Sequence, residues 1–381
     1  MKYFPKTLTQ KLQLREQNNA LRKLPIQNDR IDFSSNDYIG FAKSNVIFNQ
    51  THQFLIDNNY IENGATGSRL ISGNHPLYEI TENYLAHFHQ SETALIFNSG
   101  YDANIGFFSC VPQKEDFILY DELCHASIRD GIQLSKAKSY KFNHNDYEDL
   151  ERLILKFIEN KTNIYIVTES VFSMDGDTPD LEKIVNLSEK YSCYLVVDEA
   201  HAIGVFGNKG EGLIQINDFQ DYIFARIVTF GKGLGCHGAV ILGSKELKEY
   251  LVNFARSFIY TTGLSPHAIA TIYIAYQQLE NEGKEIKTLK ENIIFFNQQK
   301  QLMGLKPIFV RSKSAIHCAI IPGNDNVKNI ASQLQEKGFE VKAILSPTVP
   351  EGQERLRFCL HNYNSEKEIT EVLALMCTFV F

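Results

Sequence analysis

The sequence of 381 residues lacks several features that would direct its interpretation elsewhere. No window offers about 18 uninterrupted apolar residues, the length that a membrane-spanning helix needs. The first residues, Met1 to Lys6, lack the apolar stretch of a signal peptide. The seven cysteines form no Cys-x-x-Cys pair and have no histidine at metal-ligand spacing, so we expect reduced thiols and no metal. These absences favour a soluble, cytoplasmic protein.

The chain also has no excess of basic residues. Its formal net charge of −7 argues against general nucleic-acid binding, which needs a basic face. An anionic small substrate stays possible, because a few well-placed arginines or lysines can hold one. With 44% hydrophobic and 22% charged residues the chain can bury a sizeable core. Its length suits one large and one smaller domain.

Short apolar runs alternate with helical patterns through the first two thirds of the chain. Strands are predicted at 94–97, 117–120, 164–168, 194–197 and 223–228, and helices after His75-Pro76, from about Tyr101, over 127–135 and over 181–191. This alternation predicts a mostly parallel sheet covered by helices on both faces, which is the α/β class. Ligands of such sheets bind beyond the carboxyl ends of the strands.

Three parts of the chain are expected. Residues 1–45 form an N-terminal arm with a polar helix over 7–23 and an extended segment at 31–33. Residues 46–287 form the large domain. Residues 288–381 form a small α+β domain, with strands at 316–321, 339–341 and 356–360, a helix over 327–337 and a final helix.

The most informative residues are Asp198 and Lys232. Asp198 ends one apolar run, and Lys232 follows another and is flanked by Gly231 and Gly233. Pyridoxal phosphate (PLP) needs a lysine for its Schiff base and a carboxylate that keeps its ring nitrogen protonated. Each residue alone would be ordinary, a surface lysine or a helix cap. Together, at strand ends, they predict a PLP enzyme.

Other residues could complete such a site. The segment 98–101 lies between a predicted strand and a predicted helix, where backbone N–H groups can bind a phosphate. Thr229 offers a hydroxyl close to the lysine. His201 could contact the phenolic oxygen of PLP, and His125 could cover the face of its ring. By themselves these would be turn residues and structural or solvent-facing histidines.

Two further segments follow predicted strands or begin one. Ser173 supplies a hydroxyl in an acidic loop whose spacing does not match an EF-hand, so no metal site is predicted there. Arg357 and Arg355 alternate at the start of a strand, so both are expected on one face or on either side of a bend. A guanidinium can hold a substrate carboxylate through two parallel bonds, although solvated arginines would produce the same pattern.

Taken together, the motifs resemble the α-oxoamine synthases, PLP-dependent transferases of the aspartate-aminotransferase fold (fold type I). The matching stretches cover nearly the whole chain in order, at 33–40, 67–73, 197–201, 229–233 and 347–352. The resemblance implies that Lys232 carries PLP, Asp198 pairs with its ring nitrogen and His201 pairs with its phenolic oxygen. It also implies that His125 stacks on the ring, while Gly100, Tyr101, Ser173 and Thr229 complete the cofactor site.

The resemblance implies substrate and subunit contacts as well. Arg357 would hold the amino-acid carboxylate, and the remaining predicted substrate residues are Arg22, Asn36 and Thr348. Family members are homodimers with active sites at the interface, so Thr261 and Thr262 are expected to reach the partner's phosphate.

Within the family, residues 34–38 and 172–177 are most similar to members that join L-alanine to a pimeloyl thioester, on coenzyme A (CoA) or acyl carrier protein, for biotin synthesis. Leu345 stands where such synthases can carry an arginine, so one acyl-end contact differs. Glycine with acetyl-CoA and serine with a long acyl thioester remain alternatives, and a plain aminotransferase is less favoured. A PLP-fold binding or regulatory module is the non-enzymatic alternative.

Overall fold

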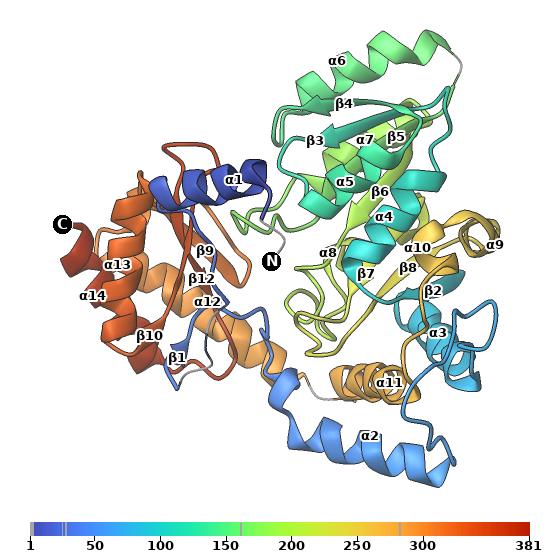
Figure 1. The fold of residues 1–381 in the computed structure, drawn as a ribbon, viewed down its shortest axis with the longest axis horizontal. Helices are drawn as coiled ribbons and strands as arrows, with labels where there is room; N and C mark the ends of the chain where they lie inside the picture. The colour runs from blue at the N-terminus through green and yellow to red at the C-terminus, as the bar shows by residue number, and fades with distance from the viewer. Residues whose placement is uncertain (1–3, 25, 27–28, 161, 282) are drawn as a thin grey trace. The chain divides into compact units, whose positions relative to one another are not determined.

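The computed structural model describes residues 4–24, 26, 29–160, 162–281 and 283–381 (Figure 1). The chain divides into two compact units. The large unit comprises Asn36–Ser173 and Asp177–Thr288, and the small unit comprises Met1–Ser35, Met174–Gly176 and Leu289–Phe381. The N-terminal segment to Ser35 therefore groups with the C-terminal part of the chain. Among the described residues, no helix is long and apolar enough to cross a membrane.

Within the described residues, the large unit contains a seven-stranded sheet with the order β2-β8-β7-β6-β5-β3-β4. Its strands are β2 (Thr93–Phe97), β3 (Phe117–Asp121), β4 (Lys138–Phe142), β5 (Ile164–Glu169), β6 (Tyr194–Asp198), β7 (Ala225–Thr229) and β8 (Ala239–Gly243). All neighbours run parallel except β8, which is antiparallel to both β2 and β7. The predicted α/β class with a mostly parallel sheet is confirmed.

Helices cover both faces of this sheet (Figure 1). The helices of the large unit are α2 (Asn45–Asp57), α3 (Pro76–Phe88), α4 (Gly100–Cys110), α5 (Ala126–Leu134), α6 (Tyr147–Phe157), α7 (Leu181–Lys190), α8 (Leu213–Ile216), α9 (Lys245–Phe254), α10 (Arg256–Ile259) and α11 (Pro266–Asn281). α4, α5 and α9 pack on one face, and α6 and α7 pack on the other.

The central strands are apolar throughout because both of their faces are buried. In β6, Val196 faces the core under α4 and α5, whereas Leu195 and Val197 face the core under α6 and α7. Successive side chains of a strand point to opposite faces, so a strand with helices on both sides has no polar position until its end. The first polar residue of β6 after this run is Asp198.

The small unit has the expected α+β character. A three-stranded antiparallel sheet is formed by β9 (Ile316–Ile320), β11 (Lys342–Ile344) and β12 (Arg355–Cys359), and a parallel pair by β1 (Ile31–Asp32) and β10 (Phe339–Glu340). The remaining helices are α1 (Lys6–Gln17), α12 (Lys284–Leu302), α13 (Asn324–Glu336) and α14 (Glu366–Val380).

The prediction of an arm helix as far as residue 23 is wrong. Helix α1 ends at Gln17, and Asn19 adopts a left-handed conformation with φ of 48°. The backbone N–H of Ala20 then donates to the carbonyl of Arg15 at 2.7 Å, which closes the last turn. Because the stretch beyond Gln17 is polar, helical periodicity gave no indication of this stop.

Glu199, the residue after Asp198, is part of the core rather than the site. It is fully buried and forms an ion pair with Arg226 of β7, which is 3% exposed. The Glu199 carboxylate also accepts hydrogen bonds from the backbone N–H groups of Leu213 at 2.7 Å and Ile214 at 3.1 Å. This carboxylate therefore ties the start of α8 to the sheet.

Glu199→Gln is expected to lower the free energy of unfolding by about 3–5 kcal/mol, because Arg226 would keep a buried charge without its partner. Urea denaturation checks this value. Glu92→Gln is the control, since its ion pair with Lys245 is solvent-exposed and should be worth less than about 1 kcal/mol. Equal losses in the two variants would contradict a special role for the buried pair.

Candidate active site

Asp198 is held at the carboxyl end of β6 by two hydrogen bonds. It is 6% exposed. The side-chain amide of Asn104 on α4 donates to Asp198 Oδ2 at 2.9 Å, and the backbone N–H of Ala200 donates to Oδ1, also at 2.9 Å. The carboxylate is thus fixed in orientation and almost completely removed from water.

Lys232 lies beside His201. Its Nζ is 2.7 Å from His201 Nε2, and the other ring nitrogen, Nδ1, is 2.7 Å from the hydroxyl of Tyr38. Tyr38 in turn donates to Asn36 Oδ1 at 3.1 Å. Both Tyr38 and His201 are buried. The structure therefore brings three predicted site residues, Lys232, His201 and Asn36, into one hydrogen-bonded chain through a tyrosine that had not been predicted.

The backbone around Lys232 is held in a tight loop between the antiparallel strands β7 and β8. The N–H of Phe230 donates to the carbonyl of Gly238 at 2.9 Å, and the N–H of Cys236 donates to that of Phe230 at 2.8 Å. A Cβ atom at Gly233 would lie 2.4 Å from the carbonyl oxygen of Ile203. This loop therefore requires glycine next to the lysine, because the neighbouring backbone leaves no room for a side chain.

His125 is the N-cap of α5 and is connected to Asp198. Its Nδ1 is 2.8 Å from Ser127 Oγ, which accepts from the Asn104 amide at 3.0 Å, and Asn104 also binds Asp198. Burial and the positive charge of Lys232 lower the pKa of His125. This histidine therefore favours its neutral form, which suits a ring that stacks on a cofactor rather than one that carries charge.

Glu169 ends β5 and pairs in register with Asp198 of β6. Its Oε1 accepts from the backbone N–H of His125 at 2.5 Å. Complete burial, together with the negative charge of Asp198, raises the pKa of Glu169 to about 8. At neutral pH the pair therefore avoids two full negative charges in one buried place.

A candidate phosphate cradle lies at the N-terminus of α4, where orphan N–H groups and the helix dipole favour anions. Gly100 begins this helix, and a Cβ atom built on it would lie 3.5 Å from the side chain of Thr229. Asn98, two residues earlier, donates to Thr261 Oγ1 at 3.1 Å and to the carbonyl of Thr262 at 2.7 Å. The predicted phosphate residues Gly100, Thr229, Thr261 and Thr262 thus surround one junction.

Two other predicted cofactor residues are placed in the large unit. Tyr101 is 50% exposed and its hydroxyl donates to Asp130 at 2.8 Å. Its backbone N–H lies in the first turn of α4, whereas its ring stands partly in solvent. Ser173 is 6% exposed and ends the first segment of the large unit.

His144 fastens the loop that contains Ser173. Its Nδ1 is 2.9 Å from Asp121 Oδ1 and its Nε2 is 2.8 Å from Asp177 Oδ2. Burial alone would lower the pKa of His144, but the hydrogen bonds with both carboxylates and their charges outweigh it and raise this pKa to about 10. The ring also meets Phe172 edge-on at 4.5 Å. His144 is therefore a positively charged link between the ends of β3 and β5.

The predicted substrate residues Arg22, Thr348 and Arg357 belong to the small unit. Arg22 donates to Thr348 Oγ1 at 3.2 Å. Arg357 is 8% exposed and its guanidinium contacts Cys359 Sγ at 3.0 Å, while Arg355 forms a buried ion pair with Asp175. The structure brings Arg22 and Thr348 together, and their roles toward a substrate stay predictions.

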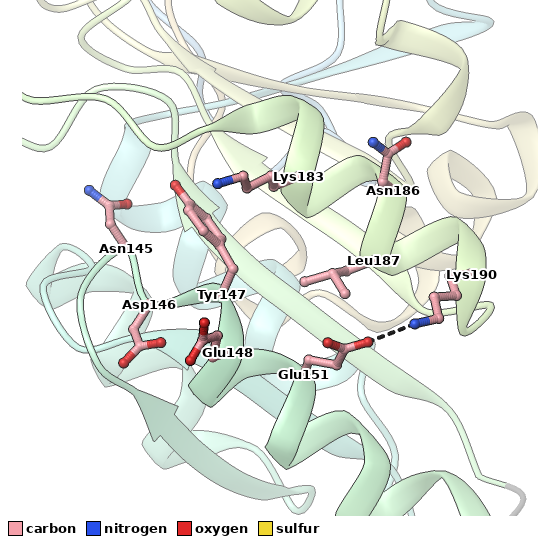
Figure 2. A pocket seen from close by; sticks show the side chains of 9 residues that line it. All are labelled: Asn145, Asp146, Tyr147, Glu148, Glu151, Lys183, Asn186, Leu187 and Lys190. Carbon is pink, nitrogen blue, oxygen red and sulfur yellow. Dashed lines mark hydrogen bonds and ion pairs between the residues drawn. The ribbon is translucent and has the colours of Figure 1, made fainter.

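A cavity of about 680 Å³ opens on the large unit between α6 and α7, where Figure 2 shows Lys183, Lys190 and Glu151 on its walls. None of its nine lining residues is a predicted site residue. Two of its lysines are already paired, Lys190 with Glu151 at 2.8 Å and Lys183 with Asp180 at 3.7 Å. This cavity is separate from the residues around Lys232.

Comparison with known proteins agrees with this geometry. A family model for aminotransferase class I and II matches residues 28–374. The chain belongs to the aminotransferase class I and II family. It is 36% identical, over 397 aligned residues, to an 8-amino-7-oxononanoate synthase of Emericella nidulans, with 98% of this chain and 95% of that protein covered.

Solved structures of the same family have the same fold. The 8-amino-7-oxononanoate synthase of Francisella tularensis is 29% identical with a TM-score of 0.77, covering 93% of this chain and 98% of that chain. The serine palmitoyltransferase of Sphingomonas wittichii is 26% identical with a TM-score of 0.87, covering 98% and 96%. The fold-type I architecture expected from the sequence is confirmed.

The cofactor of this aminotransferase-family enzyme is PLP. The residues present fit it. Asp198 is a buried carboxylate held by two donors. The amine of Lys232 follows β7, the strand that neighbours β6 in the sheet. The N-terminus of α4 lies close to Thr229 at the end of β7. These are the three groups that a protonated ring nitrogen, an aldehyde and a phosphate require.

Sequence reasoning missed Tyr38, Asn104 and Glu169. Tyr38 lies inside the stretch 33–40 that carries the family resemblance, so it could have been named as a site residue. Nothing in that stretch, however, indicates a contact with His201. Asn104 sits in the second turn of a helix, and Glu169 is the last residue of an apolar strand, where a carboxylate is usually a cap or solvent-exposed. Only the register of β5 and β6 brings Glu169 beside Asp198, and only the packing of α4 on the sheet brings Asn104 to it.

His144 should make stability depend on pH. Its folded pKa of about 10 exceeds the ordinary 6.5, so its contribution is complete below about pH 6.5 and is lost as pH rises through 10. Relative to wild type, His144→Gln should lose about 2 kcal/mol at pH 6, after allowance for solvent screening, and almost nothing near pH 10.5. Urea denaturation at four pH values measures this difference.

The exposed His87 on α3 provides the control as His87→Gln, which should leave stability nearly unchanged at every pH. A deficit in His144→Gln that stays constant, or that grows with pH, would contradict the charged link to Asp121 and Asp177.

Proposed function

We propose that this enzyme condenses L-alanine with a pimeloyl thioester, carried by CoA or acyl carrier protein, to form 8-amino-7-oxononanoate in biotin synthesis. The reaction releases carbon dioxide and the free thiol of the carrier. The observation that carries the proposal is the contact of 2.7 Å between Lys232 Nζ and His201 Nε2 beside the fixed carboxylate of Asp198. The names of the relatives support the choice of amino acid and acyl group.

When bound, PLP supplies a ring that stabilises negative charge at the amino acid's Cα. The protein supplies the rest. The Asp198 carboxylate would accept the N–H of the ring nitrogen, and its two donors, the Asn104 amide and the Ala200 backbone N–H, fix its orientation. Lys232, once its amine is free, takes the Cα proton of alanine and later returns one, as a lysine with a variable protonation state can do.

The remaining cofactor residues hold position. His125, whose orientation is set by its contact with Ser127, would cover the ring face, and His201 would contact the phenolic oxygen. The first N–H groups of α4, at Gly100 and Tyr101, and the hydroxyls of Ser173 and Thr229 would bind the phosphate. By holding the ring and the substrate carboxylate in fixed positions, His125 and Arg357 would keep the Cα proton of alanine within reach of Lys232.

Substrate selection belongs to four residues in this proposal. Arg357 binds the alanine carboxylate through its guanidinium, and Asn36 lies next to the Lys232 chain through Tyr38. Arg22 and Thr348, already in contact with each other, bind the acyl substrate. Because Leu345 is apolar, Arg22 is the basic residue among those proposed to bind the acyl substrate.

The proposed assembly is a homodimer in which Thr261 and Thr262 contribute to the partner's phosphate site. Asn98 fixes both residues, because its amide donates to the hydroxyl of Thr261 and to the carbonyl of Thr262. We place the enzyme in the cytoplasm, because all seven cysteines are described and all are free thiols.

The substrate pair can be tested by thiol release. Purified enzyme with PLP and pimeloyl-CoA should release free thiol with L-alanine at least tenfold faster than with glycine or serine, detected with a thiol reagent. Acetyl-CoA with glycine and palmitoyl-CoA with serine are the comparison pairs. Preference for either comparison pair would reassign the substrate, and no turnover with any pair would favour a binding or regulatory module.

The cofactor lysine can be tested independently. Lys232→Ala should lose the visible absorbance band of lysine-bound PLP and reduce kcat by at least three orders of magnitude, since both attachment and proton transfer depend on this amine. Lys245→Ala, a change at an exposed lysine, should keep the band and the activity. A Lys232→Ala protein that retains both would overturn the assignment.

A further inference from the structure

Glu169 and Asp198 place two carboxyl groups side by side on one face of the sheet. Their Cα atoms pair in register on the parallel strands β5 and β6, and paired positions of adjacent strands point to the same face. The contacts agree, because Glu169 Oε1 accepts from the backbone N–H of His125 at the start of α5, and Asp198 Oδ2 accepts from Asn104 on α4. Glu169 is 2% exposed and Asp198 is 6% exposed. Water therefore screens neither group.

The two carboxyl groups differ in the number of donors that they receive. Asp198 accepts from the Asn104 amide and from the backbone N–H of Ala200, each at 2.9 Å. In the part of the chain that the structure describes, the Glu169 side chain accepts from a single N–H, that of His125 at 2.5 Å. A buried carboxylate needs several donors to stay charged, whereas a protonated carboxyl needs fewer. Asp198 is therefore the better site for the negative charge, and Glu169 is the better site for a proton.

The titratable groups that face Glu169 come from each neighbouring element of the sheet. They are Asp121 at the end of β3, Cys124 and His125 before α5, Asp198 on β6 and Lys232 after β7. Burial, followed by the charge of Asp198, raises the pKa of Glu169 to about 8, although Lys232 opposes this effect. Burial also raises the pKa of Cys124 and lowers that of His125, so both are neutral at neutral pH. Without cofactor, the pair thus holds one negative charge and one proton.

We propose that Glu169 holds a proton while Asp198 has no cationic partner, and that it releases this proton when the protonated ring nitrogen of PLP pairs with Asp198. The inference rests on that pairing, which is part of the proposed function. The step is balanced: the O–H bond of the Glu169 carboxyl breaks, the proton leaves to water, and a carboxylate remains. The ring nitrogen brings its own proton, so none is transferred to the ring.

The reason for the release is electrostatic. The negative charge of Asp198 makes a second negative charge on Glu169 unfavourable, and a cation within hydrogen-bonding distance of Asp198 offsets that repulsion. The ring also displaces water, which opposes ionisation. Glu169 is already buried, however, so this second effect adds little. The net result is a lower pKa for Glu169 once the ring nitrogen is in place.

A charged Glu169 would hold His125 more firmly than a neutral one. Hydrogen bonds to an ionised acceptor are roughly twice as strong as those between neutral groups. The donor is the backbone N–H of the N-cap of α5, and a helix N-terminus also favours a negative charge. Cofactor binding would therefore strengthen the contact behind the histidine that is proposed to cover the ring. Glu169 is thus a positioning residue that acts through His125.

The proton on Glu169 can be tested without cofactor by the variant Glu169→Gln, which keeps the shape and the acceptor oxygen but cannot ionise. Wild type should lose stability as pH rises from about 4.5, the ordinary pKa of this acid, to about 8, because a buried carboxyl must ionise. The stability of Glu169→Gln relative to wild type should therefore rise across this interval and level off above it. Urea denaturation of the cofactor-free proteins measures the difference. A constant or falling difference would overturn the proposal.

Two further variants show whether the pH trend belongs to this pair. Glu82 is equally buried, but its oxygens bind Arg69 at 2.5 Å and Lys248 at 2.9 Å, so Glu82→Gln should be less stable than wild type across the whole interval. In the Asp198→Asn background, Glu169→Gln should gain less stability with pH, because the neighbouring charge is gone. An equal gain in both backgrounds would contradict the part assigned to Asp198.

The release of the proton can be counted with pyridoxine 5'-phosphate. This compound has the ring nitrogen and the phosphate of PLP but no aldehyde, so it forms no Schiff base with Lys232. Calorimetry of its binding at neutral pH, in buffers of different ionisation enthalpy, gives the number of protons released. Wild type should release about half a proton more than Glu169→Gln, or a larger excess. Equal numbers of protons in the two proteins would overturn the release.

Infrared spectroscopy of wild type keeps the test valid if Glu169→Gln does not fold. A protonated carboxyl has a carbonyl band of its own, and labelling glutamate with carbon-13 shifts that band and distinguishes it from aspartate. At neutral pH the glutamate band should be present without cofactor and should weaken when pyridoxine 5'-phosphate is added. A band that is unchanged by this addition would contradict the proposal.

This proposal and the proposed substrates fail in distinguishable ways. If no acyl thioester releases thiol, the substrate assignment fails, yet the stability, calorimetric and infrared measurements use no acyl thioester and still report on Glu169. If thiol release from pimeloyl-CoA with alanine is confirmed, and Glu169 shows neither the pH trend nor the proton release, only the role of Glu169 is wrong.

Discussion

The carboxyl end of β6 is the constraint on which the rest of the large unit depends. Two consecutive acidic residues leave the strand on opposite sides, because side chains alternate along a strand. Asp198 turns toward α4 and is fixed by Asn104, and Glu199 turns to the other side and binds the buried Arg226. Two adjacent residues of the backbone therefore serve different purposes: Asp198 belongs to the cofactor site, and Glu199 stabilises the core of the sheet.

Around this point the neighbouring strands contribute by register. β5 ends with Glu169 beside Asp198, and β7 ends with Thr229 just before the loop of Lys232. A buried acid next to Asp198 would be unfavourable as a second negative charge, and its raised pKa avoids that cost at neutral pH. The hydrogen bonds that run from His125 through Ser127 and Asn104 to Asp198 connect three elements without any residue in common with the Tyr38 chain. The site is therefore supported from two directions.

The sequence was sufficient for β2, β3, β5, β6 and β7, since their apolar runs have clear ends, and for Asp198 and Lys232, since they follow two of those ends. The strand β8 was not predicted, although it is equally apolar and buried. The sequence was also insufficient for β4, whose residues 138–142 are mostly polar on an exposed edge. Asn104 and Tyr38, which contact Asp198 and His201, were not predicted for a different reason. Their importance comes from contacts with residues about a hundred or more positions away in the chain, and no local pattern encodes such a contact.

The single antiparallel strand β8 has a consequence for how this enzyme can vary. Because β8 returns directly beside β7, the segment between them is a closed hairpin loop rather than a helical crossover. Two of its glycines lie against neighbouring backbone, because a Cβ at Gly233 would lie 2.4 Å from the Ile203 carbonyl oxygen and a Cβ at Gly235 would lie 2.1 Å from the N of Ala42. Side chains have no space at these two positions, so the backbone on either side of Lys232 is confined to one conformation while its amine extends on a flexible stem. Changes of acyl or amino-acid specificity are therefore expected in other segments of the chain, where side chains can be exchanged without a clash with the backbone of this loop.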